Sequence, residues 1–278
     1  MSQRQTGFEV PDRDGMPMLG LGTWQNEDPG QCADSVETAL NVGYRHVDTA
    51  QIYGNEDAVG DGIAAADVDR EDVFLASKVW INKLGSDDVI ASTKESLEKL
   101  GTEYVDMMYV HWPAGDYDPA ETLPAFAELQ DEGHVEHVGV SNFEPEHLDA
   151  ARDVLDDGPF ANQVEMHPLL QQDELREYAE GSDVELVAYS PLARGKVFDV
   201  PELNEIAEKH DASEAQVSLA WLRELGVTTI PKATSEAHIR DNWGSLGVEL
   251  DDEDMDRIAA IDRTDRRVHP DFGPDSWD

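Results

Sequence analysis

The chain is poor in basic residues, with 20 Lys and Arg against 61 Asp and Glu, which gives a formal net charge of −41. A surface this negative repels phosphate backbones, so the composition argues against a nucleic-acid ligand. The acidic residues are spread along the sequence, as in the pairs Asp87-Asp88 and Asp251-Asp252. Binding to a basic partner would favour a segregated acidic tail or face over this even spread.

Cysteine, long apolar runs and an N-terminal targeting pattern are also missing. The single cysteine, Cys32, excludes an intramolecular disulfide and agrees with a reducing compartment. No apolar run approaches the roughly 18 residues of a membrane span, and the first ten residues, MSQRQTGFEV, lack the features of a signal peptide. We therefore expect a cytoplasmic protein that does not enter a membrane.

Strand and helix patterns alternate along the 278 residues, which are enough for one large core. Buried strands are expected at 19–24, 44–48, 73–78, 105–111, 135–141, 162–166, 184–189 and 227–231. Helical patterns follow them at 28–42, 56–66, 87–100, 118–132, 144–155, 172–180, 201–210 with 213–225, and 235–243. We also expect a hairpin within residues 7–18, an extra C-terminal helix at 251–261, and an irregular tail, with Phe272 and Trp277, across the barrel mouth or side. Residues 1–278 are expected to form a single domain.

Polar residues stand at the C-terminal end of strand after strand, which is how a parallel α/β barrel builds its site. The residues are Asp48 with Tyr53 five positions later, Lys78, His111, Ser141 with Asn142, Gln163, Tyr189 with Ser190, and Lys232. A doubly wound sheet is the rival architecture, and it would gather such residues at a topological switch point. Contributions from nearly every strand favour the closed barrel.

Seven motifs occur in order over nearly the whole chain: GYRHVDTAQIYGNE, ASKVW, YVHWP, GVSNF, NQVEMHP, AYSPLARG and IPKATS. Together they resemble the aldo-keto reductases, and in particular the diketogluconate-reductase-like branch. The resemblance implies an α/β fold of the (α/β)8 TIM-barrel type and an NAD(P)H-dependent reduction of aldehydes and ketones to alcohols. It implies Asp48, Tyr53, Lys78 and His111 as catalytic residues. It further implies that Trp24, Trp80 and Trp112, with Tyr53 and His111, line the substrate pocket.

Carbonyl reduction needs a hydride on carbon and a proton on oxygen, so the site needs a cofactor and a general acid. Tyr53 is the candidate acid. A free phenol has a pKa of about 10, and we expect the nearby Lys78 ammonium to lower it. Asp48 would balance the buried lysine, and His111 would orient the carbonyl. Each residue alone has an ordinary structural explanation, but four at successive strand ends favour the catalytic one.

The segment Gly20-Leu21-Gly22 lacks the third glycine of the dinucleotide fingerprint, so a different cofactor cradle is required. The resemblance implies that Ser141, Asn142, Gln163 and Asp48 lie at the nicotinamide, with Tyr189 stacked on its ring. It places Gly22, Thr23, Ser190, Leu192, Arg194 and Lys196 near the pyrophosphate, although a solvated loop explains Arg194 and Lys196 equally well. The resemblance also implies that the adenosine end of the cofactor is bound by Lys232, Ala233, Thr234, Ser235, His238, Asp241 and Asn242.

Two positions depart from the NADP-binding pattern of the family, since Ala233 replaces a serine and His238 replaces an arginine. Arg240 is not an obvious substitute, because residues two apart on a helix point about 200° apart. Lys232 and Ser235 of the pattern remain, so NADP(H) is the expected cofactor. NAD(H) is left open as a second one because the arginine is missing.

Two other functions stay open. The first is a regulatory protein that keeps the fold and the cofactor without significant turnover. The second, more distant one is a metal-dependent barrel hydrolase built on Glu165 and His167. We assign no metal, and we expect His134 and His137 to be solvated residues at the opposite end of the barrel. The expected partner is a small carbonyl substrate bound by a monomer, and no residue tells a sugar aldehyde from a keto acid or a methylglyoxal-like compound.

The composition resembles that of proteins from salt-accumulating halophiles, and it generates a prediction about stability. Raising the salt to 1 M shortens the Debye length to about 3 Å and screens the repulsion between acidic residues. We expect the melting temperature to fall markedly when KCl is lowered from molar concentration to dilute buffer. An unchanged melting temperature between these conditions would contradict this interpretation.

Overall fold

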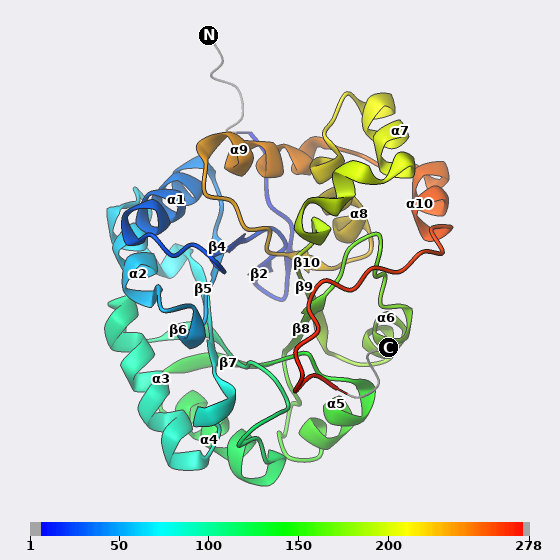
Figure 1. Cartoon of the computed structure of the whole chain (residues 1–278). Helices are drawn as coiled ribbons and strands as arrows, with labels where there is room; N and C mark the ends of the chain where they lie inside the picture. The colour runs from blue at the N-terminus through cyan, green and yellow to red at the C-terminus, as the bar shows by residue number, and fades with distance from the viewer. Residues whose placement is uncertain (1–6, 275–278) are drawn as a thin grey trace.

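Eight parallel strands form a closed ring at the centre of the molecule (Figure 1). In this computed structural model, which describes residues 7–274, the strands lie side by side in sequence order. They are β3 (Leu21–Gly22), β4 (His46–Asp48), β5 (Phe74–Val79), β6 (Val105–Val110), β7 (Val135–Ser141), β8 (Ala161–Glu165), β9 (Glu185–Tyr189) and β10 (Thr228–Thr229). Parallel bridges from Leu19 to Thr229 and from Gly22 to Lys232 close the ring between the first and last strands. The expected barrel is confirmed.

Helices surround the strands and connect each one to the next (Figure 1). They are α1 (Pro29–Val42), α2 (Glu56–Ala65), α3 (Ser86–Leu100), α4 (Pro119–Asp131), α5 (Pro145–Arg152), α6 (Asp173–Glu180), α7 (Pro201–His210), α8 (Glu214–Glu224), α9 (Glu236–Gly244) and the extra helix α10 (Asp252–Ala259). Short 3-10 helices are η1 (Gln51–Tyr53), η2 (Arg70–Asp72), η3 (Ile81–Lys83), η4 (Ala193–Asp199) and η5 (Ser245–Gly247). No helix of residues 7–274 is long and apolar enough to cross a membrane.

Aspartate and proline fix where several helices begin. The side chain of Asp28 accepts a hydrogen bond from the backbone N–H of Gln31 at 2.8 Å, with Pro29 in the first helical position of α1. Asp118 and Pro119 begin α4 in the same way. These caps satisfy backbone N–H groups that have no partner within the helix, and a negative charge there complements the helix dipole. Part of the large acidic content therefore stabilises helix starts.

The alternation of side chains along the strands decides which residues face the barrel interior. In β5, Leu75 and Val79 pack with the helices, whereas Phe74 and Ala76 belong to a separate interior cluster. Lys78 continues the interior series because side chains on a strand repeat with a period of two. Its side chain is fully buried. The expected N-terminal hairpin, β1 (Asp12–Arg13) with β2 (Met16–Pro17), contributes Met16 to the same interior cluster.

Two glycines make room where the barrel is tightest. A Cβ atom on Gly139 would lie 2.5 Å from Cδ1 of Tyr109, which is closer than a real Cβ contact allows. A Cβ atom on Gly22 would lie 2.6 Å from the carbonyl oxygen of Ile230 at the seam where the barrel closes. Both positions therefore require glycine, because neighbouring atoms lie too close to the backbone to leave room for a side chain.

The expectation for His137 is wrong. The residue lies inside β7, where alternation turns its side chain toward the barrel interior, and it is half-buried. Its ring stacks on Phe160 at a centroid distance of 4.1 Å and on Phe74 at 6.4 Å. Burial accordingly lowers the pKa of His137. His134, directly before the strand, is partly exposed, as expected.

Candidate active site

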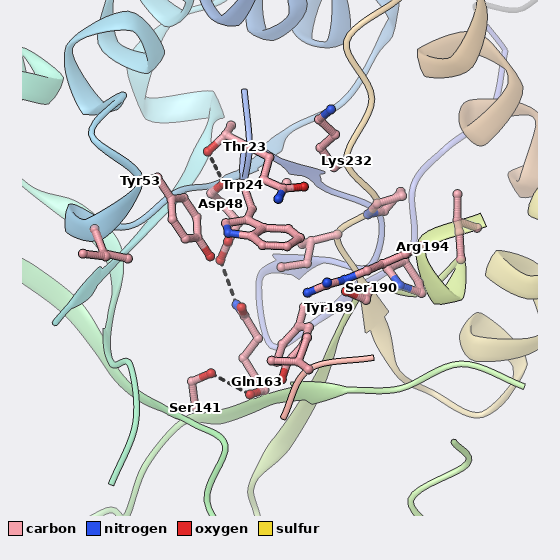
Figure 2. Close-up of a pocket in the computed structure, with 18 of the residues that line it drawn as sticks. Thr23, Trp24, Asp48, Tyr53, Ser141, Gln163, Tyr189, Ser190, Arg194 and Lys232 are labelled. Carbon is pink, nitrogen blue, oxygen red and sulfur yellow. Dashed lines mark hydrogen bonds between the residues drawn. The ribbon is translucent and has the colours of Figure 1, made fainter. Parts of the chain in front are cut away.

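A cavity of about 660 Å³ opens at the C-terminal ends of the strands, where the sequence places its polar residues (Figure 2). Most of the residues expected at the site line this cavity. They are Gly22, Thr23, Trp24, Asp48, Tyr53, Trp80, His111, Trp112, Ser141, Asn142, Gln163, Tyr189, Ser190, Leu192, Arg194, Lys232, His238, Asp241 and Asn242. The structure therefore brings together side chains from the ends of all eight barrel strands and from helix α9.

Five expected residues are not part of the lining that the described residues form. Lys78 lies beneath it, fully buried. Lys196 forms an exposed pair with Asp199 at 3.6 Å. The other three, Ala233, Thr234 and Ser235, lie between the cavity residues Lys232 and His238. Of these, Ser235 caps α9, because its Oγ accepts a hydrogen bond from the backbone N–H of His238 at 3.3 Å.

A buried ion pair stands at the floor of the cavity. Lys78 Nζ donates to Asp48 Oδ1 and, at 2.8 Å, to the carbonyl oxygen of Thr49. The second carboxylate oxygen of Asp48 accepts a hydrogen bond from Gln163 Nε2 at 2.7 Å (Figure 2). Both charged side chains are at most 2% exposed. Because buried charges are costly unless paired and hydrogen-bonded, these contacts explain how the barrel tolerates them.

Tyr53 lies beside this pair, on η1 after β4. Lys78 Nζ is 5.2 Å from the centre of its ring. Burial raises the pKa of Tyr53 well above its ordinary value, and the nearby Asp48 carboxylate raises it further. The expectation of a lowered pKa is therefore wrong, because desolvation of the phenol and the charge of Asp48 together outweigh the attraction of the Lys78 ammonium for the phenolate. Tyr53 remains a protonated phenol throughout the neutral pH range.

His111 follows β6 and faces Tyr53, with ring centroids 5.8 Å apart. Burial, assisted by the charge of Lys78, lowers the pKa of His111 well below its ordinary value. The imidazole is therefore neutral near pH 7 and carries one N–H. Its Nδ1 has no hydrogen-bond partner among the described residues. The cavity floor thus presents two neutral hydrogen-bonding side chains, Tyr53 and His111, to one region.

The ends of β7, β8 and β9 carry a connected set of amide and hydroxyl groups. Ser141 Oγ donates to the carbonyl oxygen of Gln163 at 2.7 Å (Figure 2). Asn142 Nδ2 donates to the carbonyl oxygen of His111 at 3.1 Å, and Asn142 Oδ1 accepts from the hydroxyl of Tyr189 at 2.8 Å. Asn142 has a φ of 63°, in the left-handed region that asparagine tolerates better than most residues. These bonds fix a polar wall beside the Tyr189 ring.

Two cations also line the cavity. Arg194 stacks its guanidinium over the Trp24 ring at 4.4 Å and thereby links the loop after β9 to the end of β3. Lys232, after β10, is exposed at the cavity edge. In a chain with so few basic residues, two cations on one cavity are suited to an anionic group of a ligand.

Helix α9 borders the same edge. His238 is exposed and lines the cavity, whereas Arg240 pairs with Glu236 at 2.8 Å on an exposed face. Arg240 thus points away from His238, as the helical spacing predicts. The carboxylate of Asp241 accepts hydrogen bonds from Ser213 Oγ at 2.8 Å and from Gln216 Nε2 at 3.1 Å, which ties α9 to the start of α8.

Aromatic rings form the outer wall of the cavity. The Trp80 ring lies 5.0 Å from that of His111, and Phe272 of the C-terminal tail meets Trp80 at 5.8 Å and Trp112 at 5.4 Å, all edge to face. The tail therefore reaches the cavity mouth, as expected for Phe272. Trp277, named with it, lies outside the described residues.

Sequence reasoning missed part of the lining. The missed residues are Gln25, Glu27, Ile52, Phe198, Ala215, Ile230, Pro231, Val268 and Pro270. Most are apolar or loop residues without a chemical signature. Proximity to identified strand ends was the signal that could have found Ile52 and Pro231.

Glu165 and His167, the basis of the hydrolase alternative, contact each other at 2.9 Å and are fully buried. Within residues 7–274, no group of three or more His, Cys, Asp or Glu side chains is arranged to hold a metal ion. Glu165 instead accepts hydrogen bonds from the C-terminal tail.

Comparisons with known proteins agree with this site. A family model described as the aldo/keto reductase family matches residues 18–263. The chain is 42% identical over 255 residues to the glyoxal reductase of Bacillus subtilis (strain 168), covering 92% of each protein. A solved structure of a putative 2,5-diketo-D-gluconic acid reductase B is 37% identical, with a TM-score of 0.92 and 99% of each chain covered. An aldo-keto reductase of Bombyx mori solved in complex with NADP is 30% identical, with a TM-score of 0.82, covering 87% of this chain and 88% of that one.

The buried ion pair generates a stability prediction. Lys78→Met leaves the Asp48 charge buried without its counter-ion, which we expect to lower the free energy of unfolding by about 3–5 kcal/mol. The double variant Lys78→Met with Asp48→Asn removes both charges and should recover most of that loss. Urea unfolding at one fixed KCl concentration measures both. Equal stability of the single and double variants would contradict the pairing.

Proposed function

Because this chain belongs to the aldo/keto reductase family, we propose that it reduces aldehydes and ketones with NADPH, using Tyr53 as the proton donor. Reduction of carbonyl groups by an oxidoreductase is the activity of the family, and the matched region includes every strand of the barrel. The observation that carries the assignment to Tyr53 is its position beside the buried Lys78–Asp48 pair and opposite His111.

The cavity suits a nicotinamide dinucleotide in both of its chemical parts. Ser141, Asn142 and Gln163 offer hydrogen-bonding groups for a carboxamide beside the flat face of Tyr189. Arg194, which stacks on Trp24, and Lys232, which is exposed at the cavity edge, offer positive charge for phosphate groups (Figure 2). When bound, the cofactor supplies the hydride that reduces the carbonyl carbon.

The protein's own residues then handle the carbonyl oxygen. Neutral His111 donates a hydrogen bond that orients the carbonyl. Tyr53, kept protonated by burial, transfers its proton to the oxygen as negative charge develops there. A phenolate is left beside Lys78, whose ammonium stabilises it more than it stabilises the neutral phenol. The lysine thus acts on the ionised state of Tyr53, which forms only during the reaction.

Replacement of the proposed acid separates an enzyme from a regulatory protein. Tyr53→Phe removes the hydroxyl and keeps the ring, so we expect kcat to fall by roughly a factor of 10² to 10⁴. The dissociation constant for NADPH, followed by its fluorescence, should stay within about fivefold, because a hydrogen bond from the phenol hydroxyl is worth only about 1 kcal/mol. Turnover close to that of the parent protein would overturn the role of Tyr53. A parent protein that binds NADPH and reduces no carbonyl compound would instead be a regulatory protein.

For the substrate, we propose carbonyl compounds with an apolar or flat face, including small dicarbonyls. The support is the wall of Trp80, Trp112 and Phe272 around the cavity, together with the similarity to a protein named glyoxal reductase. An initial-rate screen of glyoxal, sugar aldehydes, keto acids and aromatic aldehydes in concentrated salt tests this choice.

We also propose that the protein is a single-domain monomer in the cytoplasm of a cell that accumulates salt. The net charge of −41 supports the salt-rich setting, and the single buried cysteine supports a reducing one. The support for a monomer is that the ends of all eight barrel strands and helix α9 of the one chain meet at the cavity.

The adenosine end of the site generates a prediction about the cofactor. We propose that NADP(H) is preferred through Lys232 and Ser235, with less discrimination against NAD(H) than in relatives that carry an arginine at the position of His238. A charged hydrogen bond is worth about 1.5–3 kcal/mol, so His238→Arg should widen the ratio of kcat/KM values for NADPH over NADH roughly ten- to a hundred-fold.

The matched control is Arg240→Gln, which changes a charge on the same helix at a residue that does not line the described cavity. The ratio of its kcat/KM values for NADPH over NADH should equal that of the parent protein. A parent protein that already excludes NADH by several orders of magnitude, or a His238→Arg variant with an unchanged ratio, would contradict this assignment.

A further inference from the structure

A buried carboxylate holds the C-terminal tail against the barrel. Glu165, the last residue of β8, is fully buried. Its Oε1 accepts a hydrogen bond from the backbone N–H of Arg267, and its Oε2 accepts one from the backbone N–H of Val268, each at 2.7 Å. His167 Nε2 lies 2.9 Å from Oε1. We call this arrangement of Glu165 with the two tail amides the tail clasp.

A charged glutamate holds the tail amides more strongly than a neutral side chain would. An ionised carboxylate has two acceptor oxygens, and here each one meets a backbone N–H of consecutive residues. Hydrogen bonds to a charged acceptor are roughly twice as strong as those between neutral groups. A carboxylate buried this completely is costly unless such bonds satisfy it, so the tail and Glu165 depend on each other.

The clasp fixes the part of the tail that reaches the cavity. Figure 1 shows the tail leaving α10 and crossing the barrel opening beside β8 and β9. The backbone N–H of Asp265 donates to the carbonyl oxygen of Leu169 at 2.9 Å, just before the clasp. Directly after it, Val268, Pro270 and Phe272 line the cavity, and Phe272 meets Trp80 and Trp112. Only three residues lie between Val268, which carries the second clasped amide, and Phe272, so the clasp limits where that ring can lie.

We propose that Glu165 is a positioning residue for substrate selection: it holds Phe272 against Trp80 and Trp112 through the tail clasp, and so favours carbonyl compounds with an aromatic ring. Glu165 is absent from the cavity lining that residues 7–274 form, so it acts through the tail and not by touching the substrate. This inference rests on the proposed reductase function.

Glu165→Gln tests the proposal with little change in shape. The amide keeps one acceptor oxygen and replaces the other with an NH2 donor, which cannot accept from a tail N–H. We expect kcat/KM for benzaldehyde to fall about tenfold relative to that for glyoxal, mainly through KM, because loss of a hydrogen bond to a charged group is worth roughly a factor of ten or more. The kcat for glyoxal should be unchanged.

Three further variants sharpen this result. Glu180→Gln makes the same chemical change at an exposed position of α6 and should leave the benzaldehyde-to-glyoxal ratio unchanged. Phe272→Ala, at a surface residue, should lower the ratio as Glu165→Gln does. The double variant with Glu165→Gln and Phe272→Ala should have a benzaldehyde-to-glyoxal ratio little lower than that of either single variant, because the two changes act through one contact. Glu165→Asp keeps the charge with a shorter reach, and should give a smaller shift in the same direction if the glutamine variant fails to fold.

Trypsin gives a readout that does not depend on activity. The clasped N–H groups belong to the peptide bonds after Arg266 and Arg267, which are both trypsin sites. In Glu165→Gln, cleavage at these two bonds should be about tenfold faster, since the open tail becomes more populated. Cleavage after Arg152, at the end of α5, reports on the rest of the fold and should be unchanged. The digestions are run in the salt concentration that keeps the protein folded.

The outcomes separate this proposal from the proposed function. Faster tail cleavage with an unchanged substrate ratio would overturn a role in selection, and unchanged cleavage would overturn the clasp itself. If the parent protein reduces no carbonyl compound, the proposed function fails while the trypsin comparison still decides whether Glu165 holds the tail. Faster cleavage together with a lower benzaldehyde-to-glyoxal ratio would support the proposal.

Discussion

The buried pair of Lys78 and Asp48 is the interaction on which the rest of the site depends. Two charges inside a barrel are tolerated only if their geometry is good and their remaining polar groups are satisfied. Here Gln163 from β8 and the carbonyl oxygen of Thr49 supply the extra bonds. The pair therefore depends on the registers of β4, β5 and β8. The register of β4 on β5 pairs Asp48 with Ala76, which is one interior position before Lys78. Tyr53 and His111 then acquire their opposite pKa shifts from burial around the same centre.

Charge is distributed very differently at the surface and inside. The surface is dominated by carboxylates, which begin helices and repel one another, while cations are scarce and several of them lie at or beneath the cavity. Lys78 is buried under it, Arg194 stacks on Trp24, and Lys232 stands at its edge. A polyphosphate ligand would otherwise meet a strongly negative protein, so these few cations supply the local attraction that the overall charge removes.

The strand ends were predictable from the sequence because alternation and motif order constrain them directly. Asp48, Lys78 and His111 each end a recognisable apolar run, and the structure brings them to one end of the barrel. His137 was misjudged because it was grouped with His134 as a solvated residue, although it lies within the expected strand 135–141, where alternation turns its side chain inward. The pKa of Tyr53 was misjudged because desolvation of the phenol and the charge of Asp48 outweigh the effect of a cation that the sequence makes obvious. The contact of Glu165 with residues 102 and 103 positions away leaves no local pattern, and so nothing in the sequence tied that glutamate to the tail.

The division between barrel and tail also decides how the site responds to salt. Exposed ion pairs of the tail region, such as Arg263 with Glu202, are partly solvated, and a Debye length of about 3 Å at 1 M salt removes most of their attraction. The bonds from Glu165 to the tail amides are fully buried, and mobile ions do not reach them. If the protein works in concentrated salt, a tail anchored by surface pairs would be released, whereas one anchored by a buried carboxylate keeps its position. The floor of the candidate active site and the tail clasp therefore rely on the same device, a buried carboxylate that accepts hydrogen bonds from other residues of the protein.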